Sequence, residues 1–325
     1  MTAAAAPDRS GAHVDGAGLR VGFLGPIGTF TEQALLSQAD LATADLVPLA
    51  SMPDVLRATA SGAVDLGFVA IENSIEGSVN VTVDALVFDV DLYIQREVVL
   101  PIQMNLMGLP GTRLDQVREV VSIPVATAQC REYLLVHLPD VVERATNSTV
   151  EAAQAVAKGG DPKVVAIAPT MAAELHGLEV LATDVEDHPD NATRFVLVRP
   201  GVVVAPTGHD KTSLVIFQRA DRPGSLLAIL QEFAARAINL TKLESRPTKR
   251  GLGDYCFIID LEGHIADEVV ADCLRNLKAK QADVKYLGSY PAAGEHGPAV
   301  RRDAEAAWQQ ANDWLDGLRN QVGGA

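Results

Sequence analysis

Three short clusters of small and polar residues interrupt an otherwise apolar sequence, and they carry the side chains best suited to chemistry. Residues 25–31 are GPIGTFT, residues 72–78 are ENSIEGS, and Thr193 begins a third cluster, Thr-Arg-Phe. The first two clusters directly follow apolar runs typical of buried strands, residues 20–24 and 66–71. Polar loops at strand ends commonly border a ligand cleft, so we expect these clusters to surround a small anion.

The third cluster combines a proton donor with an anion holder. The hydroxyl of Thr193 is a weak acid that can protonate a departing hydroxyl group as that group gains basicity. Arg194 can offer its planar guanidinium to a carboxylate, unless it pairs with Asp187 or Asp190 instead. The backbone amides of residues 29–31 follow a Gly-Pro-x-Gly turn and can hold a second carboxylate, although the first of these residues can also act only as a helix cap.

The second cluster leaves its chemistry open. Asn73 and Ser74 can line a cleft, or they can only tie a strand-to-helix turn through bonds to the backbone. Glu72 and Glu76 can be solvated carboxylates, since a negative charge beside an anionic ligand is costly. A raised pKa would instead make Glu76 a rival general acid.

Alternating strands and helices must position these clusters. Between residues 20 and 198, short β-branched runs alternate with helical stretches, which predicts mostly parallel sheets covered by helices on both faces. Two such sets in one segment predict two lobes with a cleft between them. Two capping boxes, Thr29-x-x-Glu32 and Ser148-x-x-Glu151, mark helix starts.

A separate domain follows the two-lobed segment. Its order of elements, βαββαβ, predicts a ferredoxin-like layout, and an apolar stripe near helical spacing in residues 303–321 predicts a further amphipathic helix. The predicted organisation is a disordered tail (1–18), a two-lobed domain (19–200, with a first lobe of about 19–75 plus 184–200 and a second lobe of about 76–183), a linker (201–211), the ferredoxin-like domain (212–290) and a C-terminal extension (291–325).

The composition narrows the function classes. The chain has 325 residues and a formal net charge of -15, which disfavours a nucleic-acid partner. Its three Cys and seven His residues lack the spacing of a metal or redox motif, and the odd Cys count fits free thiols in a reducing compartment. The N-terminal stretch lacks the features of a secretory signal, and no apolar run is long enough for a membrane span. We therefore expect a cytoplasmic protein without a metal or a membrane partner.

Together these motifs resemble the prephenate dehydratase family. The family patterns G-P-x-G-T-F-[TS], E-N-S-x-x-G-[ST]-V, S-x-P-x-x-x-x-Q-C and T-R-F are matched at residues 25–31, 72–79, 122–130 and 193–195. In the C-terminal domain, residues 224–227 and 244–247 resemble the two phenylalanine-binding motifs of the regulatory ACT domain. The resemblance covers residues 19–290 and implies an α/β fold. Its two-lobed catalytic domain would be like a type II periplasmic binding protein and would precede a ferredoxin-like ACT domain.

The resemblance also implies a reaction, the decarboxylating dehydration of prephenate to phenylpyruvate, water and carbon dioxide in phenylalanine biosynthesis, without a cofactor. It assigns catalysis to Thr193, Asn73, Ser74 and Glu76, and leaves Thr193 and Glu76 as rival general acids. It assigns substrate binding to Thr29, Phe30, Thr31, Ser122, Gln129, Arg194 and Phe195. Cys130 is expected to be a small buried residue rather than a nucleophile, and Ile123 stands where a His is frequent in the family.

For the ACT domain, the resemblance implies feedback regulation by phenylalanine, bound between the domains of a homodimer or homotetramer. Ser225 stands where a small apolar residue is common, and Glu244 and Ser245 are expected to meet the amino group of the amino acid. The residues implied for this site are Pro223, Gly224, Ser225, Leu226, Leu227, Glu244, Ser245, Arg246 and Pro247.

Two alternatives to this function stay open. Arogenate dehydratase acts on a substrate with an amino group in place of the keto group, and no residue of the sequence decides between the two substrates. A non-catalytic amino-acid sensor would share the two-lobed unit and the ACT domain, but it would need no proton donor. Substitution of Thr193 therefore separates an enzyme from a sensor.

Overall fold

The computed structural model describes residues 18–218, 222–249, 251, 254–281, 283–293, 313–319 and 321. They form two compact units. The first unit combines Val14–Val90 with Val98–Leu197, and the second unit includes Asp91–Glu97 and Val198–Ala325. The predicted tail lies outside the described residues except for Gly18, and so does most of the predicted C-terminal helix, of which residues 313–319 are helical and exposed. No helix in the described part of the chain is both long and apolar enough to cross a membrane.

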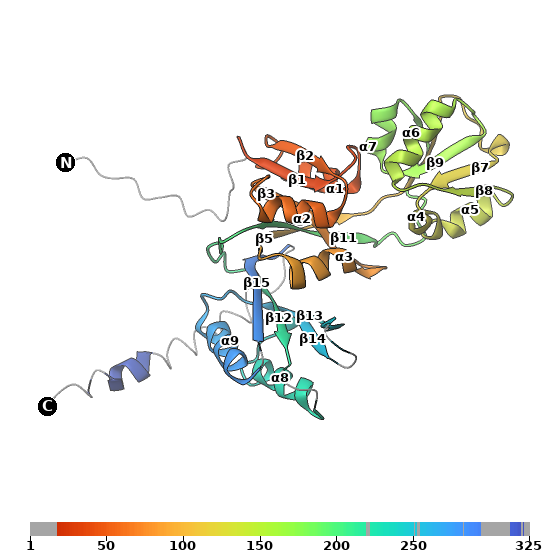
Figure 1. Ribbon diagram of the computed structural model, residues 1–325. Coiled ribbons are helices and arrows are strands. Elements are labelled where there is room, and N and C mark those ends of the chain that lie inside the picture. The colour runs from red at the N-terminus through yellow and green to blue at the C-terminus, as the bar shows by residue number, and fades with distance from the viewer. Residues whose placement is uncertain are drawn as a thin grey trace, which may run out of the picture. The chain divides into compact units, whose positions relative to one another are not determined.

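The first lobe is built on a six-stranded sheet in which β1 lies between β2 and β3 and is parallel to both (Figure 1). Alternate residues of β1 and β3, such as Val21 and Phe68, are buried in a core that includes Leu35 of α1. The sheet has the order β2-β1-β3-β11-β5, with β4 on β3. Its elements are β1 (Arg20–Leu24), α1 (Phe30–Leu36), β2 (Asp45–Leu49), α2 (Met52–Ala60), β3 (Leu66–Asn73), β4 (Gly77–Ser78), α3 (Asn80–Asp84), the π-helix η1 (Ala85–Asp89), β5 (Tyr93–Pro101) and β11 (Ala192–Arg199).

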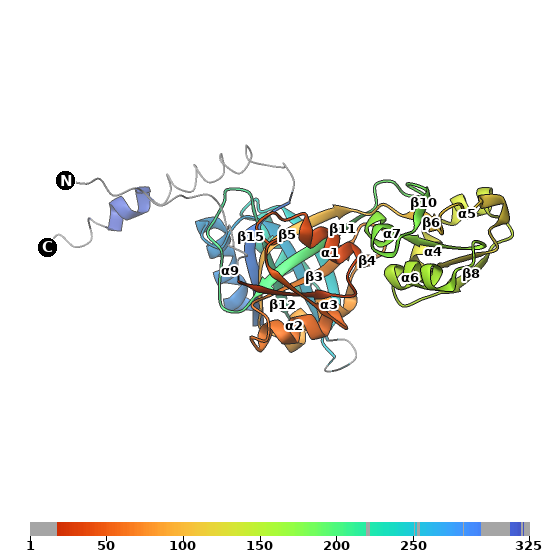
Figure 2. The ribbon, with the colours of Figure 1, turned by 90° about the horizontal axis from the view of Figure 1, so that it is seen from above.

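The second lobe is built on a five-stranded sheet of order β10-β6-β9-β7-β8, with α4, α5, α6 and α7 around it (Figure 2). The sheet is mixed, since β7 is parallel to β8 and β9, whereas β6 is antiparallel to β9 and β10. Its elements are β6 (Asn105–Gly108), the 3-10 helix η2 (Leu114–Gln116), β7 (Glu119–Ser122), α4 (Pro124–Ala128), α5 (Arg131–His137), β8 (Val142–Ala145), α6 (Thr149–Gly159), β9 (Val164–Ala168), α7 (Thr170–His176) and β10 (Glu179–Ala182).

The boundary between the lobes lies later in the chain than the sequence predicted. The predicted second lobe began near residue 76, but β4 and β5 both belong to the sheet of the first lobe. Residues 92–109 contain two strands, β5 and β6, that belong to different sheets. The chain therefore crosses between lobes after β5 and returns before β11.

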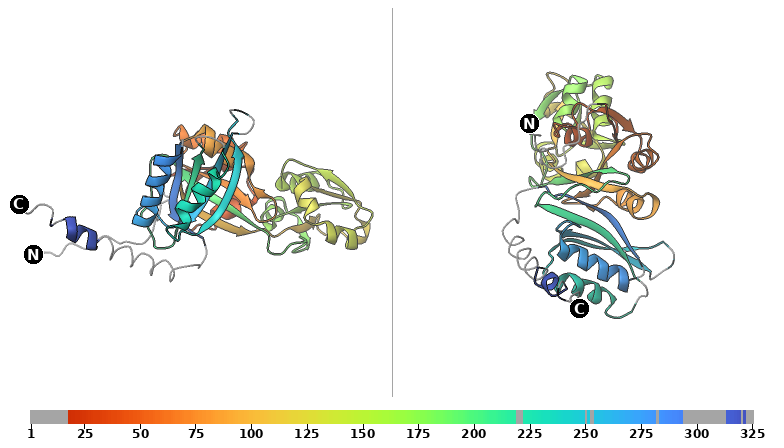
Figure 3. Two further views of the ribbon diagram at one scale, coloured as in Figure 1. Left: turned by 90° about the horizontal axis from the view of Figure 1, so that it is seen from below. Right: turned by 90° about the vertical axis from the view of Figure 1, so that its left-hand side faces the viewer.

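The second unit contains an antiparallel four-stranded sheet of order β13-β14-β12-β15. Helices α8 and α9 lie side by side on one face of this sheet and bury apolar residues such as Ile229 and Leu277 against it (Figure 3). The elements are β12 (Asp210–Phe217), α8 (Ser225–Ala234), β13 (Leu240–Pro247), β14 (Tyr255–Glu262), α9 (Glu268–Lys280) and β15 (Asp283–Pro291). Their order, βαββαβ, confirms the ferredoxin-like layout, and the two-lobed α/β unit before it is confirmed as well.

Candidate active site

A cavity of about 1240 Å³ is lined by residues from both lobes of the first unit. The first lobe contributes the turn after β1 and the end of β3, and the second lobe contributes the starts of α4 and α6. The structure thus brings together residues from all three polar clusters, 25–31, 72–78 and 193–195. The predicted residues that line the cavity are Thr29, Phe30, Thr31, Asn73, Glu76, Gln129, Thr193 and Phe195.

The start of α1 is held by a reciprocal pair of hydrogen bonds. The Thr29 hydroxyl accepts from the backbone N–H of Glu32 at 3.3 Å, and the Glu32 carboxylate accepts from the backbone N–H of Gly28 at 2.5 Å. Glu32 is buried, so its carboxylate is occupied within the turn rather than offered to a ligand. Thr29 is therefore a helix cap that also borders the cavity, and it is not a cap alone.

The start of α6 lines the same cavity and was not predicted to do so. Ser148 accepts from the N–H of Glu151 at 3.0 Å, and the Glu151 carboxylate accepts from the N–H of Asn147 at 3.0 Å. The two predicted capping boxes therefore lie on one cleft, and each helix presents the positive end of its backbone dipoles there. The capping box was the only sequence signal for this segment, and it predicted a helix start without indicating a site.

The Thr-Arg-Phe cluster lies in β11, where successive side chains point to opposite sides of the strand. Thr193 and Phe195 line the cavity, and the ring of Phe195 stacks on Phe68 with centroids 5.3 Å apart. Arg194 is absent from the lining, and its guanidinium pairs with the Glu72 carboxylate at 3.2 Å. The structure thus contradicts two expectations for Arg194, a position in the cleft and a bridge to Asp187 or Asp190.

Asn73 joins the second polar cluster to the third. Its side-chain NH₂ donates to Thr193 Oγ1 at 3.0 Å, and its side-chain oxygen accepts from the backbone N–H groups of Ile75 and Glu76 at 2.9 and 3.0 Å. Asn73 therefore stabilises the turn and contacts the candidate proton donor at once. Gln129, at the end of α4, donates to the Glu76 carboxylate at 3.1 Å and so links the two lobes.

Two other predicted residues, Ser122 and Ser74, have structural partners instead of a place on the cavity. Ser122 is buried and donates to the Ile167 carbonyl at 2.7 Å. Ser74 accepts from the backbone N–H of Ala192 at 3.0 Å and thereby holds the chain just before Thr193. Burial, with smaller contributions from nearby acidic groups, raises the pKa of the Cys130 thiol to about 12, so it stays protonated and cannot serve as a nucleophile at neutral pH.

The lining of the cavity includes no Lys or Arg side chain among the described residues, and His176 is its one group that can become cationic near neutral pH. Burial, followed by the nearby Lys158, lowers the pKa of His176 from its usual value, which favours the neutral ring. The His176 Nε2 atom is buried and has no hydrogen-bond partner among the described residues. In the sequence, nothing distinguishes His176 from the six other His residues.

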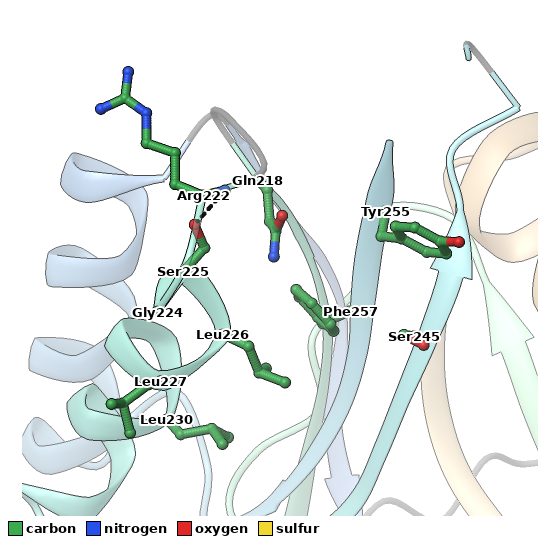
Figure 4. Close-up of a pocket in the computed structure, with 10 residues that line it drawn as sticks. All are labelled: Gln218, Arg222, Gly224, Ser225, Leu226, Leu227, Leu230, Ser245, Tyr255 and Phe257. Atoms are coloured by element: carbon green, nitrogen blue, oxygen red, sulfur yellow. Dashed lines mark hydrogen bonds between the residues drawn. The ribbon is translucent and has the colours of Figure 1, made fainter. Parts of the chain in front are cut away.

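A second cavity, of about 540 Å³, lies in the second unit between the start of α8 and the sheet (Figure 4). Gly224, with φ of 87°, allows the sharp turn into α8, and the Ser225 hydroxyl accepts from the N–H of Arg222 at 3.2 Å. Leu226 and Phe257 face each other across the cavity (Figure 4). The predicted residues on this cavity are Gly224, Ser225, Leu226, Leu227 and Ser245, and the residues missed by the sequence analysis are Gln218, Arg222, Leu230, Tyr255 and Phe257.

The remaining predicted residues of this site, Pro223, Glu244, Arg246 and Pro247, are absent from its lining. Glu244 pairs with Arg246 at 2.8 Å and with Lys242 at 3.6 Å. These three residues alternate with Ser245 along β13 and therefore lie on the opposite face of the sheet. The expectation that Glu244 meets a bound amino group is therefore not supported by its position in this chain.

Comparisons with known proteins agree with the geometry of both units. The prephenate dehydratase family profile matches residues 21–201, and the ACT domain profile matches residues 212–279. A prephenate dehydratase of Mycolicibacterium vanbaalenii is 44% identical over 313 residues, which cover 92% of this chain and 98% of that protein.

Solved structures show the same similarity. The crystal structure of prephenate dehydratase from Arthrobacter aurescens in complex with L-Phe has a TM-score of 0.84 at 40% identity, covering 93% of this chain and 100% of that one. The structure of the quorum quenching acylase GqqA has a TM-score of 0.75 at 30% identity, covering 84% of this chain and 98% of that one. The family profile spans more than half of the chain, and the curated relative is similar over nearly its whole length. With its two-lobed cleft followed by an ACT domain, this chain belongs to the prephenate dehydratase family.

Proposed function

We propose that this chain catalyses the decarboxylating dehydration of prephenate to phenylpyruvate, with Thr193 as the proton donor. The observation that carries this proposal is the hydrogen bond from the Asn73 side chain to Thr193 Oγ1, at 3.0 Å within the cavity. Because Thr193 Oγ1 accepts this bond, its own proton can point toward a ligand. The same bond stabilises negative charge on the oxygen as the proton leaves.

The reaction balances with one proton donor. The bond between the ring and its carboxylate breaks and releases carbon dioxide, and the freed electron pair moves through the ring and expels the hydroxyl group. Thr193 gives its proton to the departing hydroxyl, which leaves as water, and solvent water then returns a proton to Thr193. Formation of the aromatic ring drives these steps, so the enzyme supplies orientation and a proton, and the latter contributes typically about 10² to 10⁴ in rate.

Glu76 is the rival donor, and its Oε1 atom accepts a hydrogen bond from Gln129, which a carboxylate does without carrying a proton. The substrate is a dianion, and Arg194 is paired elsewhere. We propose that the backbone N–H groups and hydroxyls at the starts of α1 and α6 hold the carboxylate that stays on the product. Both helix starts line the cavity, and the apolar residues around them keep the departing carboxylate poorly solvated, which favours its loss.

The cavity in the second unit supports a further proposal, that it binds L-phenylalanine and regulates the enzyme. Leu226, Leu230 and Phe257 suit an aromatic ring, and Ser225, Gln218 and Ser245 supply polar groups for the amino acid head. The relative from Arthrobacter aurescens was crystallised with L-Phe. Bound phenylalanine would favour a state with a misarranged cleft, with a coupling of about 1 to 3 kcal/mol.

We also infer a homodimer or homotetramer that forms through the ACT domains, and a cytoplasmic location. Leu227, Leu243 and Tyr255 are apolar or aromatic yet exposed in the isolated chain, as expected for residues that a second copy covers. The three Cys residues are thiols rather than disulfides, which fits a reducing compartment. Light scattering after size-exclusion chromatography measures the assembly directly, and a monomeric mass would contradict the first inference.

The deciding assay measures phenylpyruvate formation from prephenate, with arogenate as the competing substrate. We expect Thr193→Val to lower kcat by about 10² to 10⁴-fold and Thr193→Ser, which keeps the hydroxyl, to lower it far less. Phenylalanine should change the rate of the wild-type enzyme. A wild-type protein that binds prephenate without turnover would support the sensor alternative, and faster turnover of arogenate would reassign the substrate.

A further inference from the structure

Asn191 lies where the two connections between the lobes meet. It immediately precedes β11, its side chain is buried, and it lines the cavity. Its backbone carbonyl accepts from the N–H of Ile102 at 2.8 Å, and Ile102 belongs to the other connection, between β5 and β6. Asn191 was part of no motif in the sequence analysis.

The side chain of Asn191 bonds to both lobes. Its oxygen accepts from the Asn73 side chain at 2.8 Å and, at a longer 3.5 Å, from the Ser74 hydroxyl, both in the first lobe. Its NH₂ group donates to the Gln129 side-chain oxygen at 3.1 Å in the second lobe. Gln129 in turn donates to the Glu76 carboxylate. One chain of hydrogen bonds therefore runs from Glu76 through Gln129 and Asn191 to Asn73 and Thr193.

The direction of this chain is set at both of its ends. The Glu76 carboxylate is the acceptor at one end, so Gln129 directs its NH₂ group toward Glu76 and its oxygen toward Asn191. At the other end, the Asn73 oxygen accepts two backbone N–H groups, so its NH₂ group must face Asn191 and Thr193. The amide of Asn191 satisfies both neighbours in a single orientation, because it has a donor for Gln129 and an acceptor for Asn73.

We infer that Asn191 is a positioning residue that keeps the Asn73 donor on Thr193 and couples this arrangement to the placement of the second lobe. The inference rests on the proposed role of Thr193 as proton donor. Without the Asn191 NH₂ group, the bond to Gln129 at the cleft is lost, and the second lobe no longer fixes the acceptor that holds the Asn73 NH₂ group. The hydroxyl of Thr193 then no longer has a single preferred direction, which lowers kcat more than substrate affinity.

Asn191→Asp tests this inference, since the new side chain has nearly the same shape and keeps the acceptor for Asn73 but lacks the donor for Gln129. Asn105→Asp is the matched control. Asn105 is also a buried Asn, it donates to the Thr170 hydroxyl at 3.1 Å, and it does not line the cavity. For both variants and the wild type, kcat, KM and the thermal midpoint of unfolding are measured between about pH 5.5 and pH 8. This range suits the titration of a buried carboxyl, whose pKa rises by up to about 3 to 5 units.

At about pH 8 we expect Asn191→Asp to lower kcat by roughly 10 to 100-fold and to change KM less than about threefold, as for loss of an interaction made in the transition state. As the pH falls, the introduced carboxylate gains a proton and with it a donor for Gln129, so kcat relative to wild type should recover about tenfold. Asn105→Asp should keep a kcat ratio to wild type that does not depend on pH.

Three results would overturn the inference. The first is an unchanged kcat in Asn191→Asp, and the second is a kcat loss that low pH does not relieve. The third is a change that does not reach the catalytic step, either a kcat loss equal to the loss of folded protein or a rise in KM with kcat unchanged. The proposed function fails separately, if the wild type does not turn over prephenate or if Thr193→Val keeps its kcat.

Discussion

Arg194 lies outside the cavity, although its position next to Thr193 suggests a role in binding the substrate. It follows Thr193 directly, and an Arg beside a proton donor is well suited to bind a carboxylate. In a strand, however, adjacent side chains point to opposite faces, so a cavity that contains Thr193 excludes Arg194. Its partner is Glu72, and only 11% of the Arg194 side-chain surface is exposed. We therefore assign Arg194 to the stability of the first lobe.

This assignment predicts that Arg194→Met lowers the free energy of unfolding by about 1 to 3 kcal/mol, because the Glu72 carboxylate loses its cationic partner. The expected loss is below that of a fully buried pair, since 33% of the Glu72 side-chain surface stays in contact with solvent. Urea unfolding measures the loss, and adding Glu72→Gln to the same protein should recover part of it. A tenfold rise in KM with unchanged stability would place Arg194 on the substrate instead.

Gly28 shows how the turn before α1 meets the second lobe. Its φ of 92° is rarely adopted by other residues, and a Cβ atom there would lie 3.1 Å from Leu175 Cδ2 and 3.5 Å from the Val150 side chain. Leu175 belongs to α7 and Val150 to α6. Because Gly28 has no side chain, the turn before α1 can lie close to α6 and α7 of the second lobe.

Gly28→Ala should combine backbone strain with displacement of α6 and α7. Gly62→Ala is its matched control, since Gly62 also has a positive φ, 75°, but has open space around the new Cβ. We expect both variants to lose about 1 to 3 kcal/mol of stability from strain, and only Gly28→Ala to lower kcat/KM by more than tenfold. Equal kcat/KM values for the two variants would show that the close approach at Gly28 is not needed for catalysis. Steady-state kinetics with prephenate and urea unfolding provide both readouts.

The two cavities lie in different compact units, so the proposed catalysis and the proposed regulation are assigned to separate parts of the chain. The regulatory proposal depends on which face of β13 borders the second cavity. Ser245 lines that cavity, whereas its neighbour Glu244 pairs with Arg246 on the other face. These two adjacent residues therefore allow a paired test.

Ser245→Leu should fill part of the cavity and raise the phenylalanine concentration of half-maximal response by more than tenfold. Glu244→Gln should leave that concentration within about threefold, because its side chain lies outside the cavity and its ion pairs are partly exposed. Titration of the dehydratase rate with phenylalanine measures both. A large effect of Glu244→Gln and none of Ser245→Leu would show that phenylalanine binds elsewhere in the assembly.

The sequence by itself determined the classes of element and the nature of the chemistry. Alternating apolar runs predicted the two lobes, the order βαββαβ predicted the ferredoxin-like domain, and the spaced motifs indicated the family. Local signals of this kind are strong because capping, strand alternation and turn residues act over a few neighbouring positions. The starts of α1 and α6 were predicted for this reason, and their caps have the expected hydrogen bonds.

Only the tertiary structure decided which residues meet. Asn73 and Thr193 are 120 positions apart, and Gln129 reaches Glu76 from the other lobe, so no local pattern could show their bonds. Asn191 forms hydrogen bonds with both lobes, and its neighbours in sequence carry no signal of them. Strand β5 joined the first sheet because pairing partners in a sheet are selected by long-range packing rather than by the strand's own residues. The sequence thus specified the groups available for chemistry, and the folded arrangement of two lobes selected those that share the cleft.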